Sequence, residues 1–158
     1  MELSKQLLII GLGNNWLSDD GIGIKLSNDL AKSHNSPDFI YRESYNGGWE
    51  LLDLIEGYKN VLFIDAIKEK GRHTGETEFL KFPEFKETMH LSHIHDSDFL
   101  TSISFGEKTG MALPENMYFF TIQIEDFLNF NKELSPGLLS KYDEILAKLK
   151  KIIDTLTF

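Results

Sequence analysis

Short apolar runs alternate with amphipathic stretches along this chain. Residues 7–10 and 60–67 form nearly continuous apolar runs, the first closed by glycine. Such runs are typical of strands that are buried on both faces of a sheet. Further strands are expected at residues 39–43, 76–82 and 117–124. The pattern therefore predicts five strands distributed along the whole chain.

Between the strands, apolar residues recur at the three- and four-residue spacings of helices with one buried face. Helices are expected at residues 20–32, 49–55, 96–104 and 135–156. Ser18 or Asp19 is expected to cap the first helix, and Pro136 stands in the first turn of the last. Residues 104–115 contain glycines and a proline with little periodicity, which predicts an exposed loop.

The alternation of strands and helices predicts the fold class α/β. We expect a single three-layer α/β/α domain over residues 1–158, with a mostly parallel central sheet covered by helices on both faces. In open sheets of this kind, ligands bind beyond the carboxyl ends of the strands. Candidate functional residues are therefore those that follow the strands.

The amino-acid composition excludes several kinds of functional site and several classes of partner. The chain has 158 residues and contains no cysteine, which excludes disulfides, thiolate metal sites and cysteine nucleophiles. Its formal net charge of −9 disfavours nucleic acid as a partner, because phosphate binding depends on basic side chains. The apolar run at residues 7–10 is too short for a signal sequence or a membrane span. We therefore expect a cytoplasmic protein that binds neither nucleic acid nor membrane.

The turn after the first strand resembles a dinucleotide-binding fingerprint but departs from it. Gly11 and Gly13 occupy the first two glycine positions of G-x-G-x-x-G, whereas Trp16 occupies the third. The third glycine normally allows close packing of helix and strand, and no Gly-Lys-Ser/Thr sequence completes a P-loop. A sharp strand-to-helix turn explains the two glycines equally well. A nucleotide- or phosphate-binding domain is thus the less favoured interpretation.

Aspartates stand at two places where the expected sheet would bind a ligand. Asp19 and Asp20 are adjacent at the start of the first helix, where capping requires only one carboxylate. Asp65 lies near the end of the most strand-like segment, where a buried carboxylate without partners would be costly. Both positions favour a functional role for an acid at the carboxyl edge of the sheet.

Three histidines lie close together in the sequence and add a possible third ligand. His90, His93 and His95 fall within six positions of one another, in a segment that is otherwise typical of a solvated loop. One imidazole together with Asp20 and Asp65 would suit a first-row divalent metal and leave coordination positions open. The residues alone do not decide which of the three histidines takes part.

At this level the sequence resembles the hydrogenase maturation proteases over almost its whole length. The motifs that carry the resemblance are G-L-G-N at 11–14, S-D-D-G-I-G at 18–23, N-G-G at 46–48, F-I-D-A at 63–66, T-G-E at 74–76, L-S-H at 91–93 and F-T-I-Q at 120–123. Each motif is weak alone, but their order and spacing are specific. The resemblance implies the same three-layer fold that the hydrophobic pattern predicts.

The resemblance also implies a set of site residues. The metal-contacting and catalytic positions of the family fall on Asp20, Asp65 and His93, with His90 and His95 as further candidates for the histidine. We expect the N-G-G glycines at 47 and 48 to bind substrate by allowing its backbone to approach closely. Which group acts as the general base stays open.

The implied activity is that of an aspartic-type endopeptidase. Such an enzyme removes a C-terminal extension from the precursor of a nickel–iron hydrogenase large subunit after nickel insertion, and it recognises the substrate-bound nickel. Nickel is then supplied by the substrate, no permanently bound cofactor is expected, and the working unit is expected to be a monomer. The alternative is a non-catalytic maturation chaperone on the same fold, which senses the metal or the partner.

Overall fold

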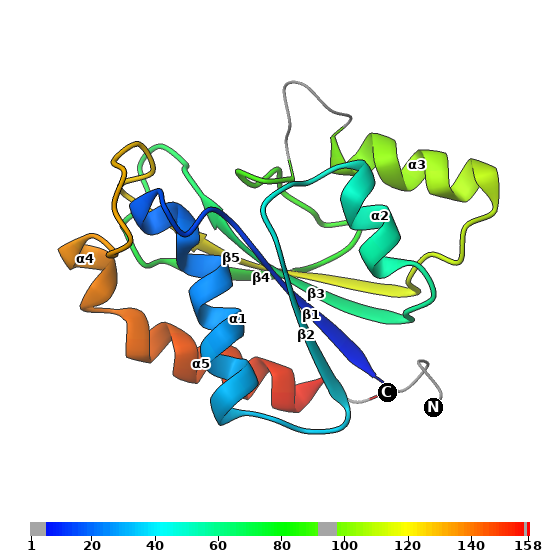
Figure 1. Cartoon of the computed structure of the whole chain (residues 1–158), viewed down its shortest axis with the longest axis horizontal. Coiled ribbons are helices and arrows are strands. Elements are labelled where there is room, and N and C mark those ends of the chain that lie inside the picture. The colour runs from blue at the N-terminus through cyan, green and yellow to red at the C-terminus, as the bar shows by residue number, and fades with distance from the viewer. Residues whose placement is uncertain (1–5, 92–97, 157) are drawn as a thin grey trace.

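A computed structural model describes residues 6–91, 98–156 and 158. Within these residues five strands form one sheet in the order β2-β1-β3-β5-β4 (Figure 1). The strands are β1 (Leu7–Leu12), β2 (Phe39–Ser44), β3 (Asn60–Ile67), β4 (Thr77–Lys81) and β5 (Asn116–Gln123). All neighbouring strands are parallel except β4, which pairs with β5 in the antiparallel direction. The predicted mostly parallel sheet is confirmed.

Helices cover both faces of the sheet, as Figure 1 shows. The helical elements are a 3-10 turn η2 (Ser18–Gly21), α1 (Ile22–Ser33), α2 (Trp49–Ile55), α3 (Phe99–Thr109), α4 (Pro136–Leu139) and α5 (Tyr142–Thr155). Buried residues of α1, α4 and α5 pack against one face, and those of α2 and α3 pack against the other. The three-layer α/β/α class is therefore confirmed.

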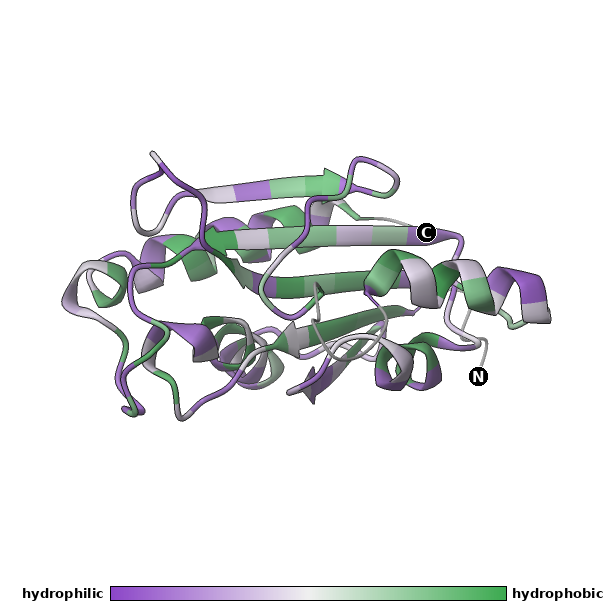
Figure 2. Ribbon diagram, turned by 90° about the horizontal axis from the view of Figure 1, so that it is seen from above, coloured by the Kyte–Doolittle hydropathy of each residue, from purple (hydrophilic) through white to green (hydrophobic). Residues whose placement is uncertain are grey.

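The core explains why the central strands are apolar on both faces. Every residue of β1 and β3 is buried, because alternate side chains enter the two helix-covered layers. Figure 2 shows these inner strands as mostly hydrophobic, with hydrophilic residues concentrated in the surrounding loops. Asp65 is thus held in an otherwise apolar strand, with 1% of its surface exposed. Such a carboxylate needs hydrogen-bond partners in the folded protein.

The predicted exposed loop at residues 104–115 is wrong in its first half. Helix α3 continues to Thr109 and ends at Gly110, which adopts φ +77. The helical pattern is hidden in the sequence because Gly106 stands on the buried face, where an added Cβ would lie 3.1 Å from Leu113. The start of this helix is set by Asp98, whose side chain accepts a hydrogen bond from the backbone N–H of Thr101.

The single helix predicted at residues 135–156 is divided into α4 and α5. The chain leaves the helix at Ser140 and resumes it at Tyr142. Leu138, Tyr142 and Ile145 keep helical spacing across this break, so periodicity cannot reveal it. Lys141 at the break donates a hydrogen bond from Nζ to the carbonyl of Thr74, 2.8 Å away.

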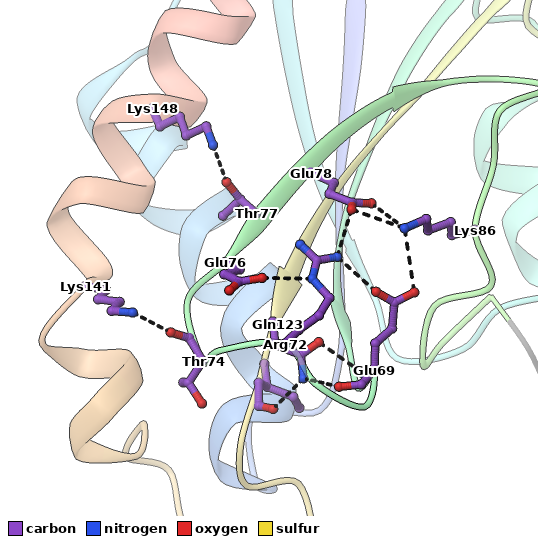
Figure 3. Close-up of polar contacts among 11 residues, drawn as sticks. Glu69, Arg72, Thr74, Glu76, Thr77, Glu78, Lys86, Gln123, Lys141 and Lys148 are labelled. Carbon is purple, nitrogen blue, oxygen red and sulfur yellow. Dashed lines mark hydrogen bonds and ion pairs between the residues drawn. The ribbon is translucent and has the colours of Figure 1, made fainter.

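The edge strand β4 is fastened by ion pairs beside the carboxyl end of β3 (Figure 3). The Arg72 guanidinium lies 3.0 Å from carboxylate oxygens of Glu69, Glu76 and Glu78. Lys86 pairs with Glu78 at 2.9 Å and so joins the segment that follows β4 to the same network. This network holds the start of the segment that returns to the sheet edge at residues 88–91.

Across the described part of the chain, no helix has the length and apolar character needed to cross a bilayer.

Candidate active site

A histidine held between two aspartates lies at the carboxyl edge of the sheet. The His90 Nδ1 atom is 2.7 Å from Asp65 Oδ1, and its Nε2 atom is 3.1 Å from Asp20 Oδ2. All three residues are buried: His90 is 8% exposed, Asp65 is 1% exposed and Asp20 is 3% exposed. They come from three separate connections of the chain, as expected for a site at the carboxyl ends of parallel strands. We refer to His90, Asp20 and Asp65 as the buried triad.

The glycines of the first helical turn bring Asp20 to this edge. An added Cβ on Gly23 would lie 2.3 Å from the carbonyl oxygen of Ile64 and 2.4 Å from that of Leu12. A Cβ on Gly13 would lie 2.1 Å from the carbonyl oxygen of Asp20. Only glycine therefore allows the start of α1 and the turn η2 to rest directly on the ends of β1 and β3. This contact sets Asp20 beside the strand that carries Asp65.

Asp65 uses both carboxylate oxygens within the protein. Its Oδ1 accepts hydrogen bonds from the Ala66 backbone N–H at 2.8 Å and from the His90 ring. Its Oδ2 accepts from the His90 backbone N–H at 3.0 Å and from the Thr88 hydroxyl. Four donors thus satisfy this buried carboxylate and fix the segment around His90. In this arrangement Asp65 orients the histidine and has no unpartnered oxygen to offer to a ligand.

Asp20 differs from Asp65 in having one unsatisfied oxygen. Its Oδ2 contacts His90, whereas its buried Oδ1 has no hydrogen-bond partner among the described residues. A buried carboxylate oxygen without a donor is costly, and it is a natural contact for a cation or a water that arrives with a ligand. Of the two predicted acids, Asp20 is therefore the one prepared to meet a ligand.

The geometry requires a charged histidine. Carboxylates only accept hydrogen bonds, so two carboxylate contacts keep a proton on each nitrogen of the ring. Burial alone lowers the pKa of His90, but the charges of Asp65 and Asp20 and their hydrogen bonds outweigh it and raise this pKa from 6.5 to about 10. An imidazolium between two carboxylates leaves one negative charge uncompensated. The buried triad therefore favours an additional positive group beside Asp20.

The raised pKa of His90 predicts how stability depends on pH. Below an unfolded pKa of about 6.5 the ring is charged in both states and its contribution is complete. The contribution is lost as the pH rises toward the folded pKa, so the free energy of unfolding should fall between about pH 6.5 and pH 10. Urea unfolding of the wild type and of His90→Gln measures this, and the stability difference between them should shrink across that range. An unchanged difference would contradict a charged His90.

Comparison with known structures bears on this geometry. No protein-family model and no curated protein sequence matches the chain. Among solved structures, it is similar to the hydrogenase maturating endopeptidase HybD from E. coli, with a TM-score of 0.71 and 22% identity over 94% of this chain and 92% of the other. A [NiFe] hydrogenase maturation protease, HycI from Thermococcus kodakarensis KOD1, gives a TM-score of 0.67 and 20% identity over 96% and 94% of the two chains.

A hydrogenase 2 maturation peptidase from Thaumarchaeota archaeon SCGC_AB-539-E09 also matches, with a TM-score of 0.65 and 17% identity over 96% of this chain and 100% of the other. This chain has the hydrogenase maturation protease fold. Because these matches cover nearly the full length of every chain compared, the shared fold includes the sheet edge that holds the buried triad.

On the hydrogenase maturation protease fold, the glycine-rich turn after β1 has a structural explanation. A Cβ on Gly11 would lie 2.5 Å from the carbonyl oxygen of Gly23. The space beside Gly11 and Gly13, where a side chain would begin, is therefore occupied by the protein's own backbone. Trp16 is 46% exposed and does not separate the helix from the strand. These contacts explain the glycines without a bound phosphate.

Of the three histidines named as candidates, only His90 lies among the described residues. His93 and His95 lie outside the described residues, so His93 as a site residue stays a prediction. His90, one of the further candidates, is the histidine that the described structure brings to Asp20 and Asp65. Within the described residues, no group of three or more His, Asp and Glu side chains is arranged to hold a metal ion. The members of the buried triad bond to one another instead of converging on one point.

Gly47 and Gly48 lie beside the same segment. Both are buried, and a Cβ on Gly47 would lie 1.9 Å from the carbonyl oxygen of His90. The sequence predicted that a substrate backbone would approach these glycines closely. At Gly47 the protein's own backbone, at His90, occupies that place. Gly48 precedes α2 with φ +70, a conformation that favours glycine. Substrate binding by these glycines stays a prediction.

Sequence reasoning missed the role of Asp19. Neither Ser18 nor Asp19 caps the helix start with its side chain. The fully buried Asp19 carboxylate instead accepts hydrogen bonds from the backbone of residues 125, 126 and 135 and from the Ser135 hydroxyl, at 2.7 to 3.2 Å. No local signal reveals this, because the donors lie more than a hundred residues away along the chain. Asp19 anchors the loop after β5, whereas its neighbour Asp20 faces His90.

Thr121 was also missed as a residue of this edge. It pairs in register with Asp65 across β3 and β5, and it is 1% exposed. Its hydroxyl has no hydrogen-bond partner within the described part of the chain. The F-T-I-Q motif was the available sequence signal, but position alone could not show that its threonine lies beside the buried triad.

Proposed function

We propose that this protein is an endopeptidase that removes a C-terminal extension from the large-subunit precursor of a nickel–iron hydrogenase. The observation that carries the proposal is the buried triad, with the unpartnered Oδ1 of Asp20, at the carboxyl edge of a hydrogenase maturation protease fold. The structural relatives are named as proteases of hydrogenase maturation, which supports the same reaction class here.

Nickel enters this proposal as part of the substrate. After insertion, the nickel held by the precursor offers a positive charge to a site that carries one uncompensated negative charge. The negative charge of Asp20 would attract it, and Asp65 supports this arrangement through its hydrogen bonds to the ring and backbone of His90. Asp20 Oδ1, which has no donor among the described residues, would stay available to accept from a water that enters with the substrate. Cleavage would thereby depend on prior nickel insertion.

The hydrolytic step follows from the same groups. A water adds to the carbonyl carbon of the scissile peptide and gives one proton to Asp20; the carbon–nitrogen bond then breaks, and the nitrogen of the extension takes up that proton. His90 is unsuited as the base because carboxylates hold a proton on each of its nitrogens. Asp65 is unsuited because four donors occupy its oxygens.

The test is incubation of the purified protein with large-subunit precursors, with and without inserted nickel. We expect loss of the extension, measured as a fall in precursor mass, only for the nickel-loaded precursor. Cleavage at equal rates without nickel would remove nickel recognition from the proposal but keep the peptidase. Stable binding of loaded precursor with no cleavage would favour the non-catalytic maturation chaperone.

A further inference from the structure

Exposed apolar side chains gather where the segment before η2 meets the loop after β5. Trp16 stacks on Phe130 with ring centroids 5.6 Å apart and an angle of 12° between the planes. Phe130 is 79% exposed and the neighbouring Leu128 is 78% exposed. Soluble proteins rarely expose groups of large apolar side chains, and such groups often mark interaction sites. We refer to Trp16, Leu128 and Phe130 as the aromatic surface.

The aromatic surface is held in place by the backbone. Asn131 donates its backbone N–H to the Trp16 carbonyl at 2.9 Å, and Ser18 donates its own to the Asn131 carbonyl at 2.7 Å. The Ser18 hydroxyl donates to the carbonyl of Glu133, and Asp19 holds both ends of the same loop. These bonds fix exposed apolar side chains in one arrangement. A preorganised surface of this kind loses little conformational entropy when it binds.

A lysine-lined cavity continues from the aromatic surface. Lys132 Nζ lies 3.8 Å from the centre of the Trp16 ring and also lines a cavity of about 460 Å³. Lys25 and Lys32 line the same cavity, together with the amide side chains of Asn15 and Asn28. On a chain with a net charge of −9, three lysines around one cavity are a local exception.

The acids of this cavity do not cancel its positive charge. Asp29 and Glu133 line the cavity opposite three lysines, so the positive charge is in excess. Lys32 forms an ion pair with Asp29 at 3.9 Å, whereas Lys25 and Lys132 pair with no carboxylate among the described residues. The cavity therefore has free cationic donors and amide groups that suit a carboxylate at the end of a peptide.

Both features join the buried triad through one turn. Trp16 and Asn15 lie just before η2, which carries Asp20, and a Cβ on Gly21 would lie 2.9 Å from the Cα atom of Asn15. A peptide bound at Asp20 can thus continue onto the aromatic surface and toward the cavity without crossing the molecule.

We propose that the aromatic surface and the lysine-lined cavity bind the C-terminal extension of the substrate, with its apolar side chains on Trp16 and Phe130 and its terminal carboxylate among the lysines. This inference rests on the proposed function and names the part of the substrate that is held. A C-terminal extension necessarily ends in an α-carboxylate that is charged at neutral pH. The occupant is therefore an apolar peptide segment with an anionic end.

Direct binding tests the carboxylate. The probe is a synthetic peptide with the sequence of the extension, prepared with a free carboxylate and with a C-terminal amide, and binding is measured by calorimetry. We expect the amide to bind about tenfold more weakly to the wild type, and the Lys25→Glu/Lys132→Glu variant to bind both peptides equally weakly. Equal binding of the two peptides by the wild type would overturn the assignment of the cavity.

Kinetics on the nickel-loaded precursor test the aromatic surface. Phe130→Ser should raise KM about tenfold with kcat within about twofold, because an exposed side chain contributes to binding and not to folding. Phe158→Ser and Lys151→Glu, which alter exposed residues away from this surface, serve as matched controls and should leave KM unchanged.

The outcomes separate this inference from the proposed function. Normal cleavage with an unchanged KM in Phe130→Ser overturns the docking surface and leaves the peptidase in place. A wild type that cleaves no precursor overturns both. Sedimentation of the wild type and of Phe130→Ser adds a further outcome: a dimer that Phe130→Ser dissociates without a change in KM would assign the aromatic surface to self-association and overturn the proposal.

Discussion

Replacement of Asp20 by Asn should lower kcat/KM for precursor processing by about a thousandfold or more. Asn keeps the size of the side chain but removes the charge that faces a cation and the oxygen that accepts a proton, and loss of such groups costs about 10²–10⁴ in rate. The fold should persist, because His90 still pairs with Asp65 at 2.7 Å in the variant. We expect the free energy of unfolding to change by no more than about 2 kcal/mol.

The loss is measured as the rate at which nickel-loaded precursor loses its extension, followed by mass. Asp143→Asn is the matched control, because it makes the same chemical change at an exposed position of α5 and should leave the rate unchanged. Wild-type processing by Asp20→Asn would exclude Asp20 as the reacting carboxylate. Circular dichroism and thermal unfolding establish that each variant is folded.

Asp65 is less suited to this test. Its substitution by Ala would leave the four donors around it without partners inside the protein, so lost activity would mix catalysis with structure. The unsatisfied Oδ1 of Asp20 makes that residue the sharper probe.

Asp19→Ala should instead destabilise the protein by about 3–5 kcal/mol, which corresponds to a fall in Tm of roughly 10 °C for a domain of this size. The reason is that the fully buried Asp19 carboxylate accepts hydrogen bonds from Ser135 and from the backbone of residues 125 and 126. Removing it leaves these donors unsatisfied around a new cavity.

Urea and thermal unfolding measure this effect. Ser135→Ala removes only the hydroxyl donor and should cost about 1 kcal/mol, which makes it a graded control. A Tm for Asp19→Ala close to that of the wild type would contradict an anchoring role. Two adjacent aspartates are thus expected to give opposite results, since Asp20 affects mainly activity and Asp19 mainly stability.

Much of the fold was predictable from hydrophobic periodicity. The bounds of β3 and α2 agree with the prediction residue for residue, because both elements carry continuous or helical apolar patterns between clear breaks. The errors have local causes. Gly106 conceals the second half of α3, and the helical spacing between Leu138 and Tyr142 conceals the break before α5.

The sequence predicted which acids lie at the candidate site, but it did not predict the role of each acid. The position of Asp65 in a buried strand and of Asp20 at a helix start follow from the order of residues along the chain. Their hydrogen-bond partners come from segments far apart in the sequence, such as His90 at 70 positions from Asp20. Periodicity describes neighbours in the chain and carries no information about such partners.

The sequence by itself determined the layers, the mostly parallel sheet, and the edge at which the two acids and a histidine meet, because these depend on local spacing and apolar character. Only the tertiary structure decided that His90 bridges the two acids, that Asp65 is saturated while Asp20 is not, and that Asp19 anchors a distant loop. The physical reason is that buried charges are stable only where the fold brings donors to them, and those donors lie elsewhere in the chain.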